Sequence, residues 1–244
     1  MRLASATARL AVSTAAALVV GGLSAAAVAG AQDALAGLPE LQSGAVRVYL
    51  VRHGQALSNL EPTPRVSAAE LDRLTPLGTK QSEAVGRALA GRGVASVFSS
   101  PASRARETAE AVARTLGVPA PLVEPRLRPL ELGRAPDGRA LGWKERAVDW
   151  QAGRDPIPAE GESLEGVGHR VGDFVRALAR SRRGASLVLV AHSEVIAAYL
   201  GEVSGTPAPK RYPPSLGNGS ISVVDVFATG AETLRLTNHM PAVP

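Results

Sequence analysis

The sequence predicts an α/β fold in which a mostly parallel sheet is covered by helices on both faces. Short apolar segments alternate along the chain with longer segments of helical periodicity, which is typical of parallel strands joined by crossover helices. The segment Leu187 to Ala191 is apolar throughout, as expected of a central strand buried on both faces. At 244 residues, the chain is long enough for one domain with a sizeable core and a short appendage.

The first expected strand, Val46 to Val51, runs directly into Arg52, His53 and Gly54. Ligands of open α/β sheets sit beyond the carboxyl ends of the strands, and a glycine there lets the backbone turn sharply. An arginine offers a planar fork of donors that suits phosphate oxygens, and nearby cations keep an imidazole neutral and therefore nucleophilic. The tripeptide suits attack by a histidine nitrogen on phosphorus, although by itself it also fits a strand end that only makes local pairs.

Two helices and a strand are expected next. Thr75 and Pro76 suit the start of a helix that extends to Gly91, with the threonine as its N-cap. Val94 to Ser99 reads as the second strand, and a helix from Ser100 to about Gly117 follows it. Arg104 lies one turn inside this helix, and helix N-termini favour anions through free N–H groups and the dipole. Arg104 is therefore a candidate phosphate ligand.

The rest of the chain contains two segments without a clear period and several regular elements. Pro62 to Asp72 reads as a loop, and polar residues 134–160 read as a lid or a substrate-recognition insert, unless Trp143 and Trp150 only pack. The regular elements are a short strand over Pro121 to Glu124, a helix from Leu164 to about Arg182, a strand over Leu187 to Ala191, a helix over Val195 to Leu200, and a hairpin of Ile221 to Phe227 with Thr233 to Thr237.

His192 ends the strand Leu187 to Ala191, much as His53 follows the first strand. Because parallel strands end at the same edge of a sheet, two histidines at two strand ends are expected to meet. A single strand-end histidine would more simply be a structural one with satisfied hydrogen bonds. The pair therefore strengthens the assignment of a catalytic site to this edge.

The N-terminus reads as a secretory signal peptide over residues 1–31. Arg2 and Arg9 are its only charges, and Leu10 to Ala29 is apolar and rich in small residues. Ala27-Val28-Ala29 fits a cleavage site, whereas an uncleaved segment would be long enough to anchor the protein in a membrane. Residues 32–45 are expected to form a linker and residues 46–244 the domain. The protein is then secreted, or periplasmic in the cell envelope.

The composition excludes several classes of site. The sequence contains no cysteine, which rules out disulfides, thiolate metal sites and a lipoprotein anchor. Without residues 1–31, the chain keeps 25 basic and 22 acidic residues, a mild excess of positive charge. The arginines are scattered and aromatic residues are few, so no nucleic-acid partner is expected.

Several segments match, in order, the motifs of one known family. The chain resembles the histidine phosphatase superfamily, in its phosphoglycerate mutase-like branch, over most of residues 46–228. One matching segment would be a weak signal, but five in the same order are a strong one. The segments are Leu50 to Gln55 with Asn59; Leu74 to Gln81; Ser99 to Ala109; Gly161-Glu162-Ser163; and Val188 to His192.

The resemblance implies a phosphoglycerate mutase-like fold and a role for each matching residue. His53 would attack phosphorus and become phosphohistidine. The phosphoryl oxygens would be held by Arg52, Arg104, His192 and Asn59, with Gln55, Ser193 and Glu162 as further substrate-binding positions. No metal or other cofactor is implied, because cationic side chains neutralise the phosphoryl group.

The general acid is the point at which this sequence departs from the family. A family glutamate four residues before a glycine corresponds here to Pro129, which cannot donate a proton. Two candidates remain, namely Glu131, two residues further on, and Glu194, which follows His192 by two residues. The family has glycine after its second histidine, and here Ser193 can still offer its N–H group.

These features together predict a secreted phosphatase that hydrolyses phosphomonoesters through phosphohistidine. The expected partner is a small-molecule or peptide phosphomonoester, and a membrane only if the signal segment is uncleaved. One alternative is phosphoryl transfer of the phosphoglycerate mutase type, which needs a cytosolic sugar-phosphate pool. Another is a catalytically inactive phosphoester-binding protein, which the residues Pro129 and Glu194 would support.

Overall fold

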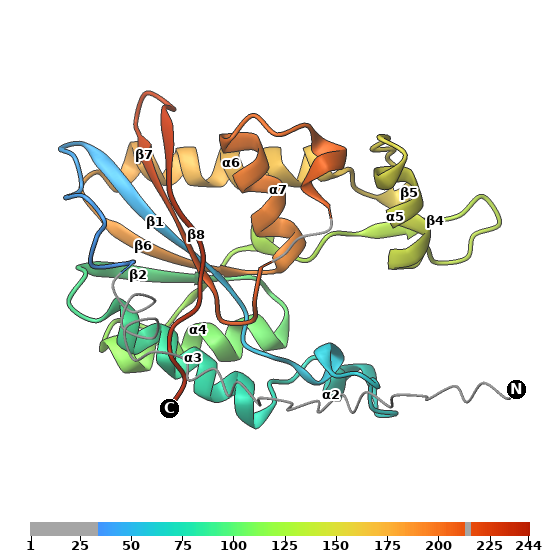
Figure 1. The fold of residues 1–244 in the computed structure, drawn as a ribbon, viewed down its shortest axis with the longest axis horizontal. Helices are drawn as coiled ribbons and strands as arrows, with labels where there is room; N and C mark the ends of the chain where they lie inside the picture. The colour runs from blue at the N-terminus through green and yellow to red at the C-terminus, as the bar shows by residue number, and fades with distance from the viewer. Residues whose placement is uncertain (1–33, 213–215) are drawn as a thin grey trace, which may run out of the picture.

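The computed structural model describes residues 34–212 and 216–244, so the expected signal peptide lies outside the described residues. Its main sheet has six strands in the order β3-β2-β6-β1-β7-β8 (Figure 1). The first four in this order run parallel to one another, β7 runs antiparallel to β1, and β8 runs antiparallel to β7. The prediction of a mostly parallel sheet is confirmed. The strands are β1 (Ala45–Arg52), β2 (Val94–Ser99), β3 (Leu122–Val123), β6 (Ser186–Ala191), β7 (Ile221–Phe227) and β8 (Glu232–His239).

Helices cover both faces of this sheet. Successive side chains of a strand point to opposite faces, and here both sets are apolar. On β1, Tyr49 and Val51 pack with residues of α3 (Pro76–Leu89) and α4 (Ser103–Leu116). The alternate residues Val48 and Leu50 pack with α6 (Leu164–Ser181) and α7 (Ser193–Val203). Figure 1 shows these helix pairs on opposite sides of the strands. Two apolar layers therefore hold β1 and β6 in the middle of the fold.

Side chains cap the starts of α3 and α6, and the threonine cap of α3 is expected from the sequence. The Thr75 side chain accepts a hydrogen bond from the Gly78 N–H, and Pro76 is the first helical residue of α3. The Ser163 side chain accepts from the Gly166 N–H at the start of α6. The helix expected from Ser100 begins later, at Ser103. This shift frees the Ser100 hydroxyl for another contact.

The loop after β1 lies directly against the start of α3. A Cβ atom built on Gly54 would lie 2.3 Å from the carbonyl oxygen of Gly78, a distance that no side chain tolerates. A glycine is needed at position 54 because the two backbones approach so closely. This contact fixes the path of the chain immediately after His53.

Two segments that read as irregular contain helices. α2 (Ala68–Leu71) begins at Ser67, whose side chain and backbone bond with Glu70 in a capping box. α5 (Trp143–Gln151) lies in the polar insert, next to a two-stranded sheet of β4 (Leu132–Arg134) and β5 (Ala159–Gly161). The loop expected over Pro62 to Asp72 was wrong at Ala68–Leu71, where the local cap begins a helix, whereas the lid or substrate-recognition insert at residues 134–160 stays a prediction. The described part of the chain also contains three short 3₁₀ helices: η1 (Leu57–Asn59), η2 (Pro125–Leu127) and η3 (Ala208–Arg211).

Part of the segment expected as a linker packs on the domain. Leu35 is buried among the residues that cover the α3 side of the sheet, and Arg92 donates a hydrogen bond to its carbonyl oxygen. Arg47 likewise donates to the carbonyl oxygen of Pro39. Across residues 34–212 and 216–244, the structure contains no helix with the length and apolar character needed to cross a bilayer.

A buried ion pair links β1 to β7. Arg47 and Asp225 are direct neighbours in the register of these strands, and two guanidinium nitrogens of Arg47 bind the carboxylate at 2.8 and 2.9 Å. The side chains are 8% and 1% exposed, and Arg235 also donates to Asp225 at 2.9 Å. Burial leaves little water to compensate either charge if its partner is lost.

We expect Asp225→Asn to lower the free energy of unfolding by about 3–5 kcal/mol, because it leaves the buried Arg47 charge uncompensated. Urea denaturation followed by circular dichroism measures the change. Asp173→Asn is the matched control, since Asp173 pairs with Arg176 but its side chain is 76% exposed. The control should change stability by no more than about 0.5 kcal/mol, and an equal loss in both variants would contradict the role assigned to burial.

Candidate active site

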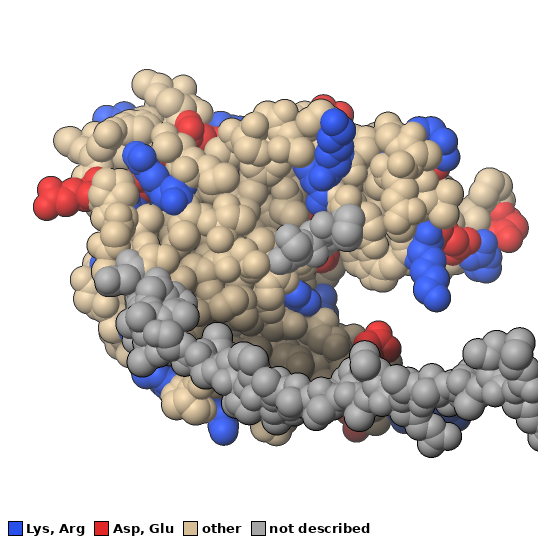
Figure 2. All heavy atoms as spheres, viewed as in Figure 1, with Lys and Arg blue, Asp and Glu red and all other residues tan. Residues whose placement is uncertain are grey.

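The two strand-end histidines meet at one edge of the sheet. Arg52 on β1 is paired with Ala191 on β6, so the residues that follow, His53 and His192, stand side by side with ring centroids 5.2 Å apart. A cleft of about 510 Å³ opens at this edge. The space-filling view is hollowed between the part that carries α5 and α7 and the part that carries α2, with basic atoms visible inside (Figure 2). The cleft is lined by Arg52, His53, Ser58, Asn59, Arg104, Trp143, His192, Ser193, Glu194 and Tyr212.

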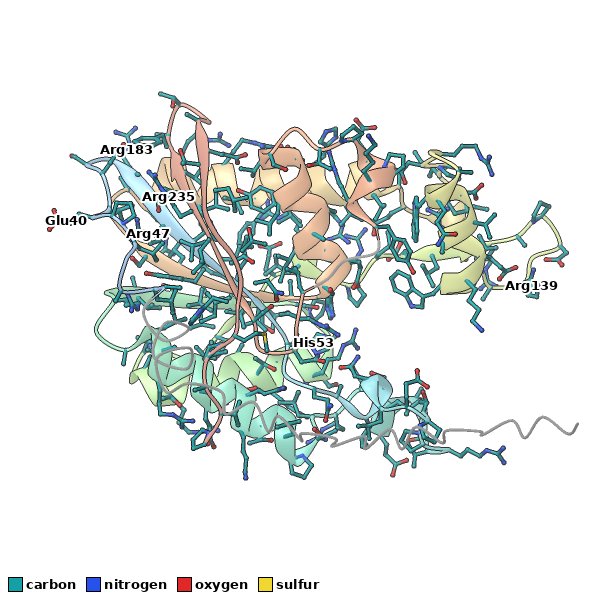
Figure 3. All side chains as sticks on the ribbon, viewed as in Figure 1. Glu40, Arg47, His53, Arg139, Arg183 and Arg235 are labelled. Atoms are coloured by element: carbon teal, nitrogen blue, oxygen red, sulfur yellow. The ribbon has the colours of Figure 1, made fainter. Side chains whose placement is uncertain are left out.

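His53 is held in one tautomer. Its Nδ1 lies 2.8 Å from the carbonyl oxygen of Gly54, which can only accept a hydrogen bond, so Nδ1 carries the proton. Arg104 Nε, which can only donate, lies 3.1 Å from Nε2 of His53. Nε2 is therefore the unprotonated nitrogen of the ring, and its lone pair points toward Arg104. Figure 3 shows His53 beyond the end of β1, at the hollow of the molecule.

The surroundings of His53 keep the imidazole uncharged. Burial, followed by the charge of Arg104 and with a smaller effect of Arg52, lowers the pKa of His53 to about 3. Burial is the first cause because water no longer stabilises the imidazolium form. At neutral pH the ring is therefore a neutral nitrogen nucleophile, as the Arg52-His53 sequence predicts.

His192 is neutral for similar reasons and faces the same guanidinium. Its Nδ1 accepts from Nη2 of Arg104 at 3.0 Å, and its Nε2 lies 2.8 Å from the hydroxyl of Ser100. Burial, then the charges of neighbouring residues, lowers the pKa of His192 well below its usual range. Sequence reasoning used Ser100 only as a helix start, and no local pattern shows that its hydroxyl orients a histidine 92 residues away.

Asp72 fixes the remaining end of the Arg104 guanidinium. It forms an ion pair with Nη1 of Arg104 and accepts a hydrogen bond of 2.7 Å from the Ser103 N–H. Burial alone would raise the pKa of Asp72, but the Ser103 and Arg104 contacts hold it below its usual value. The sequence gives no signal for this role, because Asp72 ends a segment that reads as a loop.

Arg52 and Asn59 lie on the cleft wall next to His53. Arg52 Nη1 donates to the Leu216 carbonyl oxygen, and among the described residues its buried Nε has no hydrogen-bond partner. The Asn59 side-chain oxygen accepts from the Ala56 N–H and from the amide of Asn218. With that oxygen occupied, the NH₂ group of Asn59 is the one left to bind an anion.

Gln55 lies beside the site but does not line the cleft. Its side-chain oxygen accepts from the Thr75 hydroxyl at 2.9 Å, and its backbone oxygen accepts from the Thr75 N–H at 2.9 Å. Gln55 thus joins the loop after β1 to the first turn of α3. The Gln55 side chain, which was expected to bind substrate, instead holds the start of α3 through Thr75.

Of the two candidate acids, Glu194 is the one that lines the cleft. It lies in the first turn of α7, beside Ser193, whose buried hydroxyl has no partner among the described residues. Burial raises the pKa of Glu194, while the backbone N–H groups and Arg104 oppose the rise. A carboxyl group with a raised pKa holds its proton more readily at neutral pH, as a general acid requires.

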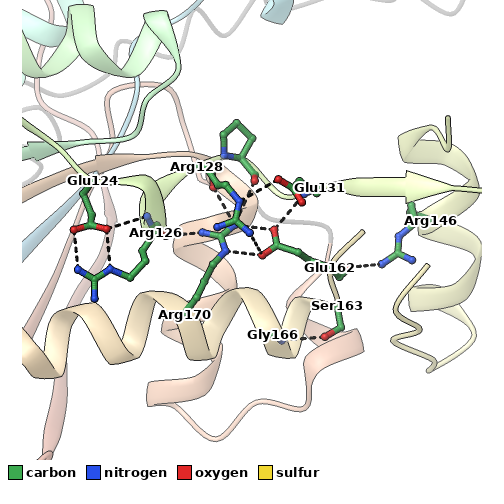
Figure 4. A network of polar contacts seen from close by, with 10 residues as sticks. Glu124, Arg126, Arg128, Glu131, Arg146, Glu162, Ser163, Gly166 and Arg170 are labelled. Carbon is green, nitrogen blue, oxygen red and sulfur yellow. Dashed lines mark hydrogen bonds and ion pairs between the residues drawn. The ribbon is translucent and has the colours of Figure 1, made fainter. Parts of the chain in front are cut away.

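Glu131 and Glu162 instead belong to a network of arginines beside the cleft (Figure 4). Arg128 binds Glu131 at 3.1 Å and Glu162 at 2.8 Å, and Arg170 binds Glu162 at 2.8 Å. The Glu131 side chain is 54% exposed and lines a separate hollow near Arg134. Neither carboxylate lines the cleft that contains His53. Arg170 also donates to the backbone oxygens of Arg126, Arg128 and Pro129 and so holds the loop that precedes Glu131.

Residues 34–212 and 216–244 contain no group of three or more histidines and carboxylates placed to hold a metal ion. The positive charge available to an anion in the cleft comes from Arg52 and Arg104. What the site offers is a neutral nitrogen, two guanidinium groups, amide and hydroxyl donors, and a carboxyl group with a raised pKa. These groups suit transfer of a phosphoryl group to nitrogen.

The profile of the histidine phosphatase superfamily (branch 1) matches residues 48–239. The chain belongs to this superfamily, and the resemblance seen in its motifs is confirmed. All strands and helices described above, apart from the start of β1, lie within the matched range.

Relatives with assigned names include both mutases and phosphatases. A probable phosphoglycerate mutase GpmB of Yersinia pestis is 29% identical over 188 residues, which cover 74% of this chain and 85% of that protein. A mycobacterial glucosyl-3-phosphoglycerate phosphatase in complex with VO3 has a TM-score of 0.63 and 26% identity, over 79% of this chain and 98% of that one. A phosphoserine phosphatase of Entamoeba histolytica in complex with phosphoserine, at 20% identity and a TM-score of 0.63 over 80% of this chain and 98% of that one, shares the fold.

The low pKa of His53 makes the stability of the fold sensitive to acid. Below pH 6.5 the unfolded chain binds a proton on this ring, whereas the folded protein does so only near pH 3. The stabilising contribution is complete above pH 6.5 and is lost as the pH falls toward 3. For one histidine, the free energy of unfolding changes by at most about 1.4 kcal/mol per pH unit.

We expect His53→Asn to flatten the dependence of unfolding free energy on pH between 6 and 4, by about 1 kcal/mol per pH unit relative to the unchanged protein. Urea midpoints across this range measure the slope. His169→Asn is the control, because His169 is exposed on α6 and its loss should leave the slope unchanged. Equal slopes for the unchanged protein and His53→Asn would contradict the neutral, buried state of this ring.

Proposed function

We propose that the protein is a phosphatase that hydrolyses phosphomonoesters through a phosphohistidine formed at His53. The observation that carries the proposal is the placement of a buried, neutral His53, with Nε2 free of a proton and directed at the Arg104 guanidinium inside the cleft. A phosphoryl group bound by this guanidinium would have its phosphorus next to the nitrogen lone pair. The family, with relatives named as phosphatases, supports the same chemistry.

In the first step, Nε2 of His53 forms a bond to phosphorus as the bond to the leaving oxygen breaks. Arg52, Arg104, the Asn59 amide and the Ser193 N–H hold the phosphoryl oxygens. A bound dianion favours the charged form of His192, which can then donate to an oxygen. Glu194 gives its proton to the leaving oxygen, so the alcohol departs neutral.

In the second step, water attacks the phosphorus of phosphohistidine. The Glu194 carboxylate takes a proton from this water, the nitrogen–phosphorus bond breaks, and phosphate leaves. His53 returns to its neutral form, and Glu194 is protonated again. The raised pKa of Glu194 suits both directions of this proton transfer.

The mutase alternative is favoured by relatives that are named as probable phosphoglycerate mutases. A mutase must return the phosphoryl group to a second hydroxyl of a phosphoglycerate before water takes it. If a labelled phosphoryl group passed from phosphohistidine to a phosphoglycerate faster than phosphate was released, the protein would be a mutase and not a phosphatase.

We expect Glu194→Gln to reduce hydrolysis of an alkyl phosphate about 10²–10⁴-fold while largely sparing an aryl phosphate. An alkoxide leaves poorly without a proton, whereas a phenolate leaves without one. Steady-state kcat/KM for butyl phosphate and 4-nitrophenyl phosphate measures the difference. His53→Ala should abolish hydrolysis of both esters.

Glu131→Gln is the matched control, because Glu131 binds Arg128 outside the cleft. It should leave the ratio of alkyl to aryl hydrolysis unchanged. If Glu131→Gln lowered this ratio and Glu194→Gln did not, the general acid would be Glu131. Binding of phosphate with no hydrolysis of either ester would make the protein an inactive phosphoester-binding protein.

We propose further that residues 1–31 are a signal peptide and that the enzyme works outside the cytoplasm. The proposal is supported by the uncharged, small-residue segment Leu10 to Ala29 and by Ala27-Val28-Ala29 before a possible cleavage point. Sequencing the N-terminus of the protein recovered from an expressing bacterium should find it at about residue 30–32. A chain that keeps Met1 and sediments with membranes would indicate an uncleaved anchor.

A further inference from the structure

The cleft has a second half, away from the phosphoryl-binding residues, that is formed by aromatic rings. Trp143, the first residue of α5, and Tyr212 both line the cleft. Their rings are nearly parallel, with an interplanar angle of 8° and centroids 6.4 Å apart. Trp143 is 42% exposed, although large aromatic side chains are costly to leave in water. The two rings together give the cleft an aromatic surface against which the ring of a ligand can pack.

The aromatic rings are held in place from behind. Tyr212 packs against Trp150 at a centroid distance of 4.6 Å, and Trp150 is buried. The indole N–H of Trp150 donates to Asp155 at 2.9 Å, and the Arg146 guanidinium lies 4.9 Å from its ring. A rigid surface loses little conformational entropy when a ligand binds to it. The wall of Trp143 and Tyr212 is thus preorganised.

The charges in the cleft limit what can lie against this wall. Arg52 and Arg104 are the only lysine or arginine residues that line it in the described part of the chain, and both adjoin His53. Asp72 already neutralises part of the Arg104 charge. A carboxylate on the leaving group would find no third cation among the described residues that line the cleft. Leaving a buried charge without a partner is unfavourable, so the site selects against anionic leaving groups.

The size of the cleft leaves room for a substantial leaving group. Its volume of about 510 Å³ falls within the roughly 300–1,000 Å³ of pockets that hold small organic ligands. A phosphoryl group alone fills only the part beside His53. The remaining space is bounded by Trp143, Tyr212, Ser58 and Glu194.

We propose that the substrate is a monophosphate ester of an uncharged alcohol that carries a ring, and that this ring lies against Trp143 and Tyr212. The inference rests on the proposed phosphatase function and names its substrate class. Ring stacking provides the affinity, while the absence of a third cation disfavours acidic esters such as phosphoglycerates. Phosphoryl transfer itself remains the task of His53, Arg104 and Glu194.

Three esters of primary alcohols test the proposal with comparable leaving groups: 2-phenylethyl phosphate with a ring, butyl phosphate without one, and 3-phosphoglycerate with a carboxylate in place of a ring. We expect kcat/KM for 2-phenylethyl phosphate to exceed that for butyl phosphate about tenfold, since aromatic contacts add to the effect of area. The value for 3-phosphoglycerate should be the lowest. Equal values for the first two, or the highest value for 3-phosphoglycerate, would overturn the proposal.

Trp143→Ala should remove most of the advantage of 2-phenylethyl phosphate over butyl phosphate, measured as the ratio of their kcat/KM values. Val148→Ala is the matched control, because Val148 is also exposed on α5 but does not line the cleft. It should preserve the ring preference. A ring preference that survives Trp143→Ala would overturn the assignment of this wall.

Binding without chemistry separates this proposal from the proposed function. Calorimetric titration of His53→Asn with 2-phenylethyl phosphate and with butyl phosphate should give about tenfold tighter binding of 2-phenylethyl phosphate. If 2-phenylethyl phosphate bound more tightly but the unchanged protein turned over neither ester, the wall of Trp143 and Tyr212 would be supported as a ring-binding surface. The phosphatase assignment would then be contradicted. Turnover of both esters with equal binding would support the phosphatase assignment and overturn the ring-binding role of Trp143 and Tyr212. If neither ester bound, both proposals would be overturned.

Discussion

The guanidinium of Arg104 is the contact on which the site depends. Its nitrogens donate to Nε2 of His53 and Nδ1 of His192, and a third forms the ion pair with Asp72. Because a guanidinium can only donate, both imidazoles must present an unprotonated nitrogen to it. The same group therefore orients the nucleophile, keeps it neutral and marks the position that an anion would occupy.

The parallel sheet places these residues without long loops. β1 and β6 are adjacent and end level with one another, so a histidine that follows each strand reaches the same point. The helices α4 and α7 begin at this edge, with Arg104 in the first turn of one and Glu194 in the first turn of the other. Their free N–H groups and dipoles favour negative charge there. Strand ends and helix starts thus concentrate anion-binding groups at one edge.

The cleft divides into two halves with different chemistry. The half at the sheet edge is built from residues in the motifs shared with the histidine phosphatase superfamily, namely Arg52, His53, Arg104 and His192. The other half is built by α5 and the residue after η3, through Trp143 and Tyr212. The sheet edge therefore carries the cationic and imidazole groups of the cleft, whereas the insert and the residue after η3 supply its aromatic rings.

The sequence by itself determined the sheet, its main helices and the pair of histidines at the sheet edge, because these features have local signals. Apolar strands, capping residues such as Thr75 and Ser163, and a histidine after a strand are visible in short segments of the sequence. The helix α5 was missed because its capping Glu145 lies in a segment dominated by polar residues, proline and glycine.

Only the tertiary structure decided which distant residues meet. The sequence left Glu131 and Glu194 as the two candidates for the acid, and the fold turns Glu131 toward Arg128 and places Glu194 in the lining of the cleft. It likewise brought Asp72 to Arg104 and Tyr212 to Trp143. Such pairs depend on how loops and helix starts pack around the sheet edge, and no local propensity or spacing in the chain encodes that packing.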